Sequence, residues 1–167
     1  MNSRRYFLIA GASTAVLGVS ALLPPLLRTS KADTMEKFEV MHTDAEWRRL
    51  LDPHAYNVLR HEGTEPPFTS PLNDEHRSGI FSCTGCAQQL YSSKTKFDSH
   101  TGWPSFWQPL NNAVITKSDD TLGMRRTEVR CHRCGGHLGH VFDDGPKPTG
   151  LRYCMNGAAM RFTPSAS

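Results

Sequence analysis

Two Cys-x-x-Cys pairs constrain this chain more than any other feature of its sequence. Cys83 and Cys86 form the first pair, Cys131 and Cys134 form the second, and 44 residues separate the two. A Cys-x-x-Cys turn can aim two thiolates at one point, and two such turns supply the closed ligand set of a structural zinc ion. The spacing therefore predicts one structural Zn²⁺ per chain, with a small β-domain folded between the two turns.

The same four cysteines allow two other interpretations. They could pair as two disulfides in an oxidising compartment, or one pair could act as a redox-active dithiol. Metal binding is favoured because both turns have short interiors and because Gly135 follows the second pair, where the backbone must turn away. A structural metal contributes folding free energy, so we expect chelation to loosen the domain.

The composition is that of one folded domain with little net charge. The chain has 167 residues, of which 21% are charged and 9% are aromatic. Residues 1–32 carry four basic and no acidic side chains, so the net charge of +3 leaves about −1 for residues 33–167. A nucleic-acid binder needs a basic face to displace counterions, so no nucleic-acid partner is expected.

Residues 1–32 have the layout of an export signal. Arg4 and Arg5 precede an apolar stretch over residues 7–27, and Ser30-Lys31-Ala32 places small residues where a signal peptidase cuts. The surroundings of Arg4 and Arg5 also resemble a twin-arginine signal. We expect a cleaved signal and periplasmic export. The alternative is a membrane anchor through residues 7–27, although two prolines interrupt that stretch.

Two helices are expected at the start of a single domain over residues 33–167. Thr43 and Glu46 form a capping box ahead of the first helix, and Asp52 caps a second that ends at Gly63. The buried face of the first helix is expected to carry three side chains: Trp47, Leu50 and Leu51. The Pro-rich segment 65–68 cannot be helical and is predicted to be an extended arm, which Glu65 is expected to orient.

Beyond residue 79 the chain is expected to be β-structure. Short apolar or aromatic runs alternate with Gly- and Pro-rich turns, as is typical of antiparallel sheets. The predicted strands are Ile80–Ser82, Gln89–Ser92, Ala113–Ser118, Met124–Cys131, Val141–Phe142, Arg152–Tyr153 and Met160–Phe162. The expected fold class is mainly β, with two small antiparallel sheets, a zinc-containing barrel-like core and two or three N-terminal helices.

Cys154 is the fifth cysteine and lies outside both pairs. It could be a reactive thiol, an intermolecular partner or a buried apolar residue. On a strand, Arg152 would share its face, and a guanidinium beside a thiol favours the thiolate. His137 and His140 precede it, with two aspartates after them, and this set is typical of a nucleophile with acid–base support. We therefore expect Cys154 to be a nucleophile.

Three long motifs resemble the B-type methionine sulfoxide reductases. They are Gly-Trp-Pro-Ser-Phe at 102–106, Gly-His-Leu-Gly-His-Val-Phe-Asp-Asp-Gly-Pro at 136–146 and Arg-Tyr-Cys-Met-Asn at 152–156, and the likeness covers about residues 36–163. The resemblance implies reduction of the R epimer of methionine sulfoxide, in peptides and proteins, by a protein with no organic cofactor. It also implies a zinc site away from the catalytic centre. We expect a monomer.

The resemblance also implies a role for individual residues. Cys154 matches the nucleophile that attacks the sulfoxide sulfur and becomes a sulfenic acid. Five further positions match groups that bind or polarise the sulfoxide and tune the thiol: His137, His140, Asp144, Arg152 and Asn156. Trp103 and Phe142 match the walls of the substrate pocket. Our hypothesis is that one or both histidines polarise the oxygen, with Asp144 helping to hold them.

The sequence departs from the family pattern at Thr101. Many relatives carry a second, resolving cysteine in this segment, whereas here Thr101 stands in its place. Since the other four cysteines are assigned to zinc, no internal disulfide with Cys154 is expected. An external reductant, either a small thiol or a thioredoxin-like protein, would have to reduce the sulfenic acid.

Two other classes of protein fit part of the sequence. A zinc-ribbon binding module would explain the two turns but not the surplus Cys154. A membrane-tethered redox chaperone would use a Cys-x-x-Cys pair, which should then react with thiol reagents in the native protein. Apart from the motifs, Trp103 and Phe142 could be core residues, and His137, between two glycines, is expected in a loop.

Overall fold

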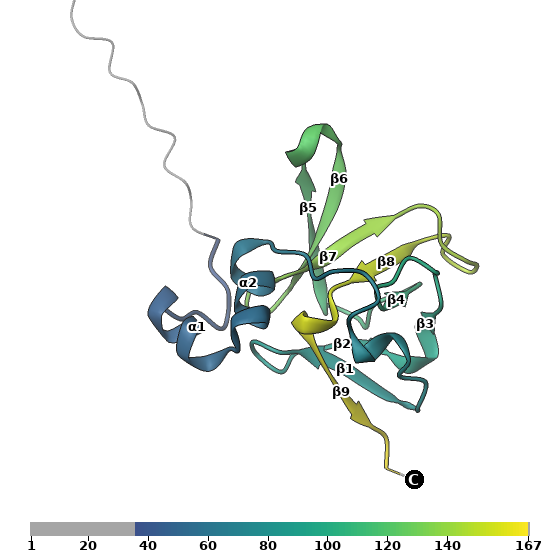
Figure 1. The fold of residues 1–167 in the computed structure, drawn as a ribbon, viewed down its shortest axis with the longest axis horizontal. Coiled ribbons are helices and arrows are strands. Elements are labelled where there is room, and N and C mark those ends of the chain that lie inside the picture. The colour runs from purple at the N-terminus through teal and green to yellow at the C-terminus, as the bar shows by residue number, and fades with distance from the viewer. Residues whose placement is uncertain (1–35, 167) are drawn as a thin grey trace, which may run out of the picture. The chain divides into compact units, whose positions relative to one another are not determined.

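The computed structural model describes residues 36–166, so the export signal and the alternative anchor expected within residues 1–32 lie outside the described residues. Within this range, two α-helices precede nine β-strands (Figure 1). The helices are α1 (Asp44–Leu50) and α2 (Pro53–His61). The strands are β1 (Gly79–Cys83), β2 (Gln89–Ser92), β3 (Lys96–Phe97), β4 (Ser105–Phe106), β5 (Val114–Asp119), β6 (Arg126–Cys131), β7 (His137–Phe142), β8 (Arg152–Met155) and β9 (Met160–Pro164).

Helix α1 begins at the predicted capping box. The Thr43 hydroxyl accepts a hydrogen bond from the Glu46 N–H at 3.3 Å, and the Glu46 carboxylate accepts one from the Thr43 N–H at 2.7 Å. Trp47 and Leu51 are buried, but Leu50 is 56% exposed, so its expected burial is wrong. Helix α1 ends at Leu50, and Leu51 turns into the core from an extended C-cap.

Helix α2 is capped by Asp52, as expected, and lies against β7. The Asp52 carboxylate accepts hydrogen bonds from the N–H groups of His54 and Ala55 at 2.9 and 3.0 Å. Glu62, not Gly63, takes the left-handed conformation at the C-cap, with φ of 55°. Gly63 follows the cap and lies close to Asn57, because a Cβ there would be 2.2 Å from the Asn57 side-chain nitrogen.

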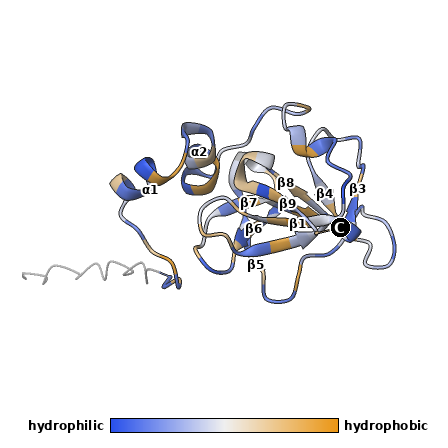
Figure 2. Cartoon of the chain, turned by 90° about the horizontal axis from the view of Figure 1, so that it is seen from below, coloured by the Kyte–Doolittle hydropathy of each residue, from blue (hydrophilic) through white to orange (hydrophobic). Residues whose placement is uncertain are grey.

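The strands form two antiparallel sheets, which confirms the expected fold class. A six-stranded sheet has the order β3-β4-β8-β7-β6-β5, and a three-stranded sheet has the order β2-β1-β9. Figure 2 shows apolar and polar stretches mixed along the strands, and burial alternates residue by residue only along β1. The sequence prediction missed the two-residue strands β3 and β4, and it began β7 at Val141 rather than at His137.

An aromatic cluster joins the two sheets. Phe81 of β1 and Tyr91 of β2 contact Phe106 of β4, with ring centroids 4.9 and 4.3 Å from it, and all three side chains are fully buried. The Tyr91 hydroxyl lies 3.1 Å from the Met155 sulfur on β8. One face of β8 therefore packs on the core through Met155, and Cys154 points to the opposite face. Within residues 36–166, no helix is long and apolar enough to cross a membrane.

Candidate active site

The two Cys-x-x-Cys turns follow β1 and β6 and have the same backbone geometry. In each, the residue after the second cysteine donates its N–H to the carbonyl oxygen of the first cysteine, from Ala87 to Cys83 and from Gly135 to Cys131, at 2.9 Å. Both donors are left-handed, with φ of 59° and 66°. The second turn needs its glycine, because a Cβ at Gly135 would lie 2.3 Å from the Phe38 ring.

The four thiols converge on one point. The sulfur atoms of Cys83 and Cys134 are 3.8 Å apart, those of Cys86 and Cys131 are 3.5 Å apart, and all four lie within 4.8 Å of one another. A tetrahedral site with Zn–S bonds of about 2.3 Å requires sulfur atoms about 3.8 Å apart. The four cysteines are free, whereas a disulfide needs sulfurs about 2.05 Å apart. The donor set therefore fits a structural Zn²⁺.

Cys154 lies on β8, where strand pairing places it in a row of polar side chains. Ser105 on β4 is opposite Cys154, His140 on β7 is opposite it on the other side, and Glu128 on β6 is opposite His140. Directly opposed residues of antiparallel strands point to the same face, with Cβ atoms about 5 Å apart. The row therefore gathers a thiol, an imidazole and a carboxylate on one face of the six-stranded sheet.

A β-bulge brings His137 to the same face as His140. Val129 pairs with Gly139 and Arg130 pairs with His137, so Leu138 is an extra residue on β7. Residues three apart on a regular strand point to opposite faces, but one extra residue returns them to the same face. The two imidazole rings accordingly lie 5.4 Å apart, edge to face. His137 is thus on a strand, and its expected loop position is wrong.

Gly139 lets this bulged strand approach β8. A Cβ at this position would lie 2.1 Å from the carbonyl oxygen of Cys154. Only glycine allows β7 to run this close to the backbone of the thiol-bearing residue. The glycine between the two histidines therefore allows the close pairing of β7 with β8 that sets His140 opposite Cys154.

Each histidine pairs with a carboxylate that was not singled out from the sequence. His137 Nδ1 lies 2.8 Å from Glu128, and His140 Nε2 lies 2.8 Å from Asp119. Burial lowers the pKa of His140, and the Asp119 hydrogen bond offsets that lowering only in part. Burial raises the pKa of Glu128, but the hydrogen bond and charge of His137 outweigh it and hold that pKa below its usual value.

Asp144 contacts Arg152 and neither histidine. Its two carboxylate oxygens accept hydrogen bonds from Arg152 Nε and Nη2, both at 2.8 Å. The guanidinium also lies over the Phe142 ring, 4.4 Å from its centroid. Asp144 therefore orients the arginine rather than the histidines, which is a correction to its expected role. The arginine shares its strand face with Cys154, as predicted.

Three hydroxyl groups lie on the other side of Cys154. The Thr101 hydroxyl is 3.8 Å from the Cys154 sulfur, and Ser99 lies within 2.8 Å of the Thr101 and Ser105 hydroxyls. Burial raises the pKa of the Cys154 thiol above its ordinary value. The Thr101 hydroxyl and the charge of Arg152 act against burial without overcoming it. The expected effect of Arg152 is therefore present, but burial outweighs it and leaves the pKa of Cys154 raised.

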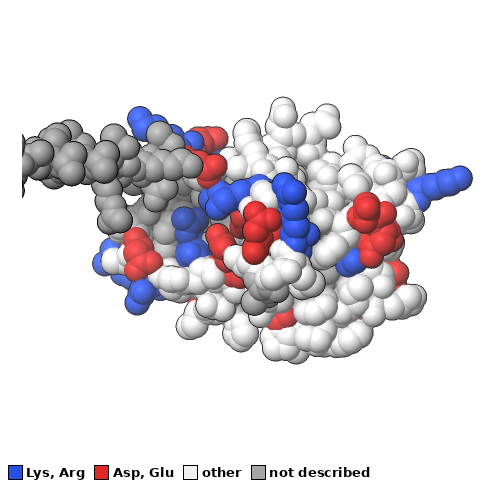
Figure 3. Space-filling model, turned by 90° about the horizontal axis from the view of Figure 1, so that it is seen from above, with Lys and Arg blue, Asp and Glu red and all other residues white. Residues whose placement is uncertain are grey.

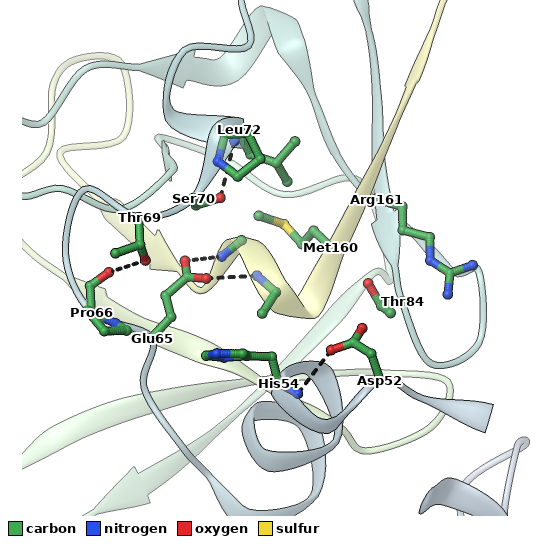
Figure 4. A pocket seen from close by; sticks show the side chains of 13 residues that line it. Asp52, His54, Glu65, Pro66, Thr69, Ser70, Leu72, Thr84, Met160 and Arg161 are labelled. Atoms are coloured by element: carbon green, nitrogen blue, oxygen red, sulfur yellow. Dashed lines mark hydrogen bonds between the residues drawn. The ribbon is translucent and has the colours of Figure 1, made fainter. Parts of the chain in front are cut away.

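The extended arm after α2 holds Trp103 and the end of β8 together through one residue, Glu65. The Glu65 carbonyl oxygen accepts a hydrogen bond from Trp103 Nε1 at 3.0 Å, and its N–H donates to the Asn156 side chain at 3.0 Å. Its carboxylate accepts from the N–H groups of Gly157 and Ala158 (Figure 4). These contacts agree with the expectation that Glu65 orients the arm.

Asn156 is buried and its polar atoms meet backbone groups. Its oxygen accepts from Glu65, and its nitrogen donates to the Leu138 carbonyl at 3.1 Å. The structure thus places Asn156 between the arm and the bulge of β7. Its expected contact with substrate stays a prediction, as do the roles of Trp103 and Phe142.

A polar cavity of about 390 Å³ lies over the histidines and their carboxylates. The groups that line it include Lys117, Asp119, Glu128, His137 and His140. A larger cavity of about 500 Å³ lies beside the Glu65 carboxylate (Figure 4). Figure 3 shows basic and acidic side chains interspersed on one face of the molecule, in keeping with the small net charge.

Known proteins resemble this chain over most of its length. The SelR domain model matches residues 51–164. A protein of Agrobacterium fabrum is 51% identical over 127 residues, covering 75% of this chain and 94% of that one, and one of Thiobacillus denitrificans is 54% identical over 123 residues, covering 73% and 93%. One of Leptospira interrogans is 49% identical over 126 residues, covering 75% and 96%. All three are named peptide methionine sulfoxide reductase MsrB. The chain therefore belongs to the SelR-domain family of MsrB proteins.

Proposed function

We propose that this chain is an oxidoreductase that reduces the R epimer of methionine sulfoxide in peptides and proteins, with Cys154 as its nucleophile. One observation carries the proposal: Cys154 lies directly opposite His140 on paired strands, with the Thr101 hydroxyl at 3.8 Å and Arg152 on the same strand face. Membership of the MsrB family supports the reaction class.

The reaction moves one oxygen between two sulfur atoms. The Cys154 sulfur attacks the sulfoxide sulfur, the sulfur–oxygen bond of the substrate breaks, and the oxygen ends on Cys154 as a sulfenic acid. The methionine sulfur gains the two electrons that the cysteine sulfur loses, and the thiol proton ends on the sulfenic oxygen. Because oxide is a poor leaving group, a proton donor must reach the oxygen during the attack.

The residues around Cys154 can supply the thiolate and the proton. Arg152 and Thr101 favour the thiolate against the burial that disfavours it. An imidazole from His137 or His140 is the natural proton donor near neutral pH. The carboxylates of Glu128 and Asp119 orient these rings, and Asp144 orients Arg152.

Trp103 and Phe142 would provide the apolar walls for the substrate. The Trp103 ring is fixed by its hydrogen bond to Glu65, and Phe142 lies beneath the Arg152 guanidinium. An apolar wall recognises the methyl end of the sulfoxide, while polar groups on the sheet face receive its oxygen.

The sulfenic acid would be reduced by an external thiol. The other four cysteines of the chain lie together in the cluster, and Thr101 stands beside Cys154. Two thiols from a small molecule, or one thioredoxin-like dithiol, return Cys154 to the thiol and release a disulfide and water. The zinc ion, held by the four cysteines, would stabilise the fold without touching substrate.

Export over residues 1–32 is part of the same proposal. The twin-arginine-like start and the small residues before Asp33 support a cleaved signal and a periplasmic enzyme. N-terminal sequencing of the protein recovered from the periplasm tests this. A product that keeps residues 7–27 in the membrane fraction would favour the anchor instead.

A stereospecific assay tests the function. With dithiothreitol as reductant, the purified protein should reduce a peptide with R methionine sulfoxide and leave the S epimer unchanged. Cys154→Ser should abolish turnover and keep the zinc content and the melting temperature, because the residue lies outside the cluster. A sulfenic-acid trap should label Cys154 alone. Turnover by the serine variant would refute the assignment.

A further inference from the structure

Three hydroxyl groups connect the Cys154 sulfur to a backbone carbonyl oxygen. Ser99 Oγ lies 2.8 Å from Thr101 Oγ1 and 2.7 Å from Ser105 Oγ, and Thr101 Oγ1 is 3.8 Å from the sulfur. At the other end, the Ser105 hydroxyl donates to the Trp103 carbonyl oxygen at 3.1 Å. Ser105 is 1% exposed. These groups therefore form one unbranched row, of which the proposed reaction uses only the Thr101 hydroxyl.

The carbonyl at the end of the row fixes the direction of every hydrogen bond in it. A carbonyl oxygen can only accept, so the single hydrogen of the Ser105 hydroxyl is used there. Ser99 must then donate to Ser105, and Thr101 must donate to Ser99, because each hydroxyl has one hydrogen. No hydrogen of Thr101 remains for the sulfur. The contact at 3.8 Å is therefore made by the S–H group of Cys154, which donates to Thr101.

A thiolate needs the opposite direction. It carries no hydrogen and can only accept, so Thr101 must turn its hydrogen toward the sulfur. Ser99 must then donate to Thr101, and Ser105 must donate to Ser99. The Ser105 hydrogen leaves the Trp103 carbonyl oxygen, and two acceptor oxygens then face each other across 3.1 Å. The links between the hydroxyls exist in both states, so the thiolate state lacks only the hydrogen bond at the far end of the row.

We propose that Ser99, Thr101 and Ser105 form a reversible hydroxyl chain, which points away from the Cys154 sulfur in the thiol and toward it in the thiolate. Ser105 is then a positioning residue, which favours the thiol through its bond to Trp103. The inference rests on the proposed role of Cys154 as nucleophile. Only hydrogens on oxygen rotate in the reversal. When the thiol ionises, its proton passes to water or buffer, because a chain that ends at a carbonyl oxygen cannot release it.

The chain changes what the Thr101 hydroxyl does for the nucleophile. Burial raises the pKa of Cys154, and a hydrogen bond from Thr101 lowers it in part. Thr101 can make that bond only after Ser105 has left the Trp103 carbonyl, so the far end of the chain opposes the near end. Ser105 also lies opposite Cys154 on paired strands, and a hydroxyl acting directly on the sulfur would favour the thiolate. The two interpretations of Ser105 therefore predict shifts of opposite sign.

Ser105→Ala tests the sign. Without this hydroxyl, neither state has a bond to the carbonyl, so the thiol loses its advantage. The curve of iodoacetamide alkylation of Cys154 against pH, followed by mass spectrometry of the Cys154 peptide, should move to lower pH. The rate near pH 7 should rise roughly twofold to tenfold, which is the effect of one hydrogen bond. The limiting rate at high pH should change little, whereas a site merely opened by the smaller side chain would raise that rate as well.

Thr101→Val disconnects the chain from the sulfur and keeps the shape of the side chain. The thiolate then loses a charge-assisted hydrogen bond and the thiol a weaker one, so the curve should move to higher pH. In this background Ser105→Ala should cause no further shift, because the sulfur no longer senses the direction of the chain. Ser82→Ala is the matched control, since Ser82 is a half-buried serine on β1 in the other sheet. Its curve should match that of the wild type.

The ionisable groups around Cys154 are the same in all of these variants, so they do not account for a difference between them. They lie on β8, on β7 and on the loop before β4, each with its partner: Arg152 with Asp144, His140 with Asp119, His137 with Glu128, and His100 with Asp98. A curve that stays in place or moves to higher pH in Ser105→Ala would overturn the proposal. A rise in the limiting rate, or a further shift in the Thr101→Val background, would do the same.

The wild-type protein offers a second measurement if Ser105→Ala does not fold. With the four clustered sulfurs bound to zinc, Cys154 is the one cysteine that carries hydrogen, so Raman spectroscopy can resolve its S–H stretching band. We expect the lowered frequency of a thiol that donates a hydrogen bond. The frequency of a non-bonded thiol would contradict the chain without any variant. Wild-type protein that fails to reduce the R epimer would instead overturn the proposed function, since neither the alkylation curve nor the Raman band depends on turnover.

Discussion

The molecule has two sulfur centres, the cluster of four cysteines and the single Cys154, and the surroundings of the thiols differ between them. In the cluster, each thiol faces other thiols across 3.5 to 3.8 Å, between two turns of matched geometry. Cys154 instead faces a threonine hydroxyl, an arginine and a histidine-bearing strand. Four thiols that face one another can bind one metal ion, which occupies their sulfur atoms. A single thiol near hydrogen-bond donors keeps its sulfur available as a nucleophile.

The two centres also differ in what they contribute: the cluster to the stability of the fold, and Cys154 to the proposed reaction. The cluster joins the ends of β1 and β6, which belong to different sheets, so it links the two halves of the β-structure. Cys154 lies within the six-stranded sheet, and it is the neighbouring Met155, not Cys154, whose side chain is fully buried in the core. Loss of a cluster thiol should therefore damage the fold, and loss of the Cys154 thiol should not.

The largest expected effect comes from opening the cluster. Cys131→Ser removes a fully buried ligand, and we expect loss of zinc and a drop in the free energy of unfolding of at least several kcal/mol, since metal binding is folding free energy. Urea unfolding with zinc analysis measures this, and a strong chelator on wild-type protein should act in the same direction. Cys154→Ser is the control. Equal free energies of unfolding for the two variants would contradict the claim that the cluster, and not Cys154, stabilises the fold.

The convergence of the four cysteines could be predicted because the signal is local. A Cys-x-x-Cys turn sets the direction of its own two thiols, and the second turn carries its own glycine. Most of the longer strands were also predictable in large part, because short apolar runs between Gly- and Pro-rich turns mark them: β1, β2, β5, β6, β8 and β9. The two-residue strands β3 and β4 were not, since pairs so short form only because β8 is available beside them.

The surroundings of Cys154 were harder to predict, because they depend on register. Glu128 lies in a predicted strand, but only the pairing with His140 and the bulge at Leu138 show that its side chain meets His137. Asp119 contacts His140 from the end of β5, 21 residues away in the chain. Neither carboxylate carries a motif that separates it from an exposed acidic residue on a strand.

A second thiol beside Cys154 would give this centre a sulfur neighbour, as each cysteine of the cluster has. Thr101→Cys places a thiol where the hydroxyl now lies 3.8 Å from the Cys154 sulfur. We expect one turnover to leave an internal disulfide, because the new thiolate can attack the sulfenic acid and release water. Mass spectrometry under non-reducing conditions detects the loss of two hydrogens. Thr116→Cys, at an exposed position of β5, should stay reduced. If the Thr101→Cys protein also stays reduced after turnover, the loop cannot bring the two sulfurs together.

The smallest expected effect concerns the charge that most distinguishes Cys154 from the cluster. Burial raises the pKa of Cys154, and the nearby Arg152 opposes that rise, so the thiolate fraction grows as pH increases through this elevated pKa. Arg152→Gln removes the opposing charge. The pKa should then rise further, so the curve of iodoacetamide alkylation against pH should move to higher pH, and the rate at pH 8 should fall roughly severalfold. Asp144→Asn should move the curve the other way by a smaller amount, because it frees the guanidinium from its carboxylate. Alkylation rates that do not change in Arg152→Gln would mean that burial and the Thr101 hydroxyl alone set the reactivity of Cys154.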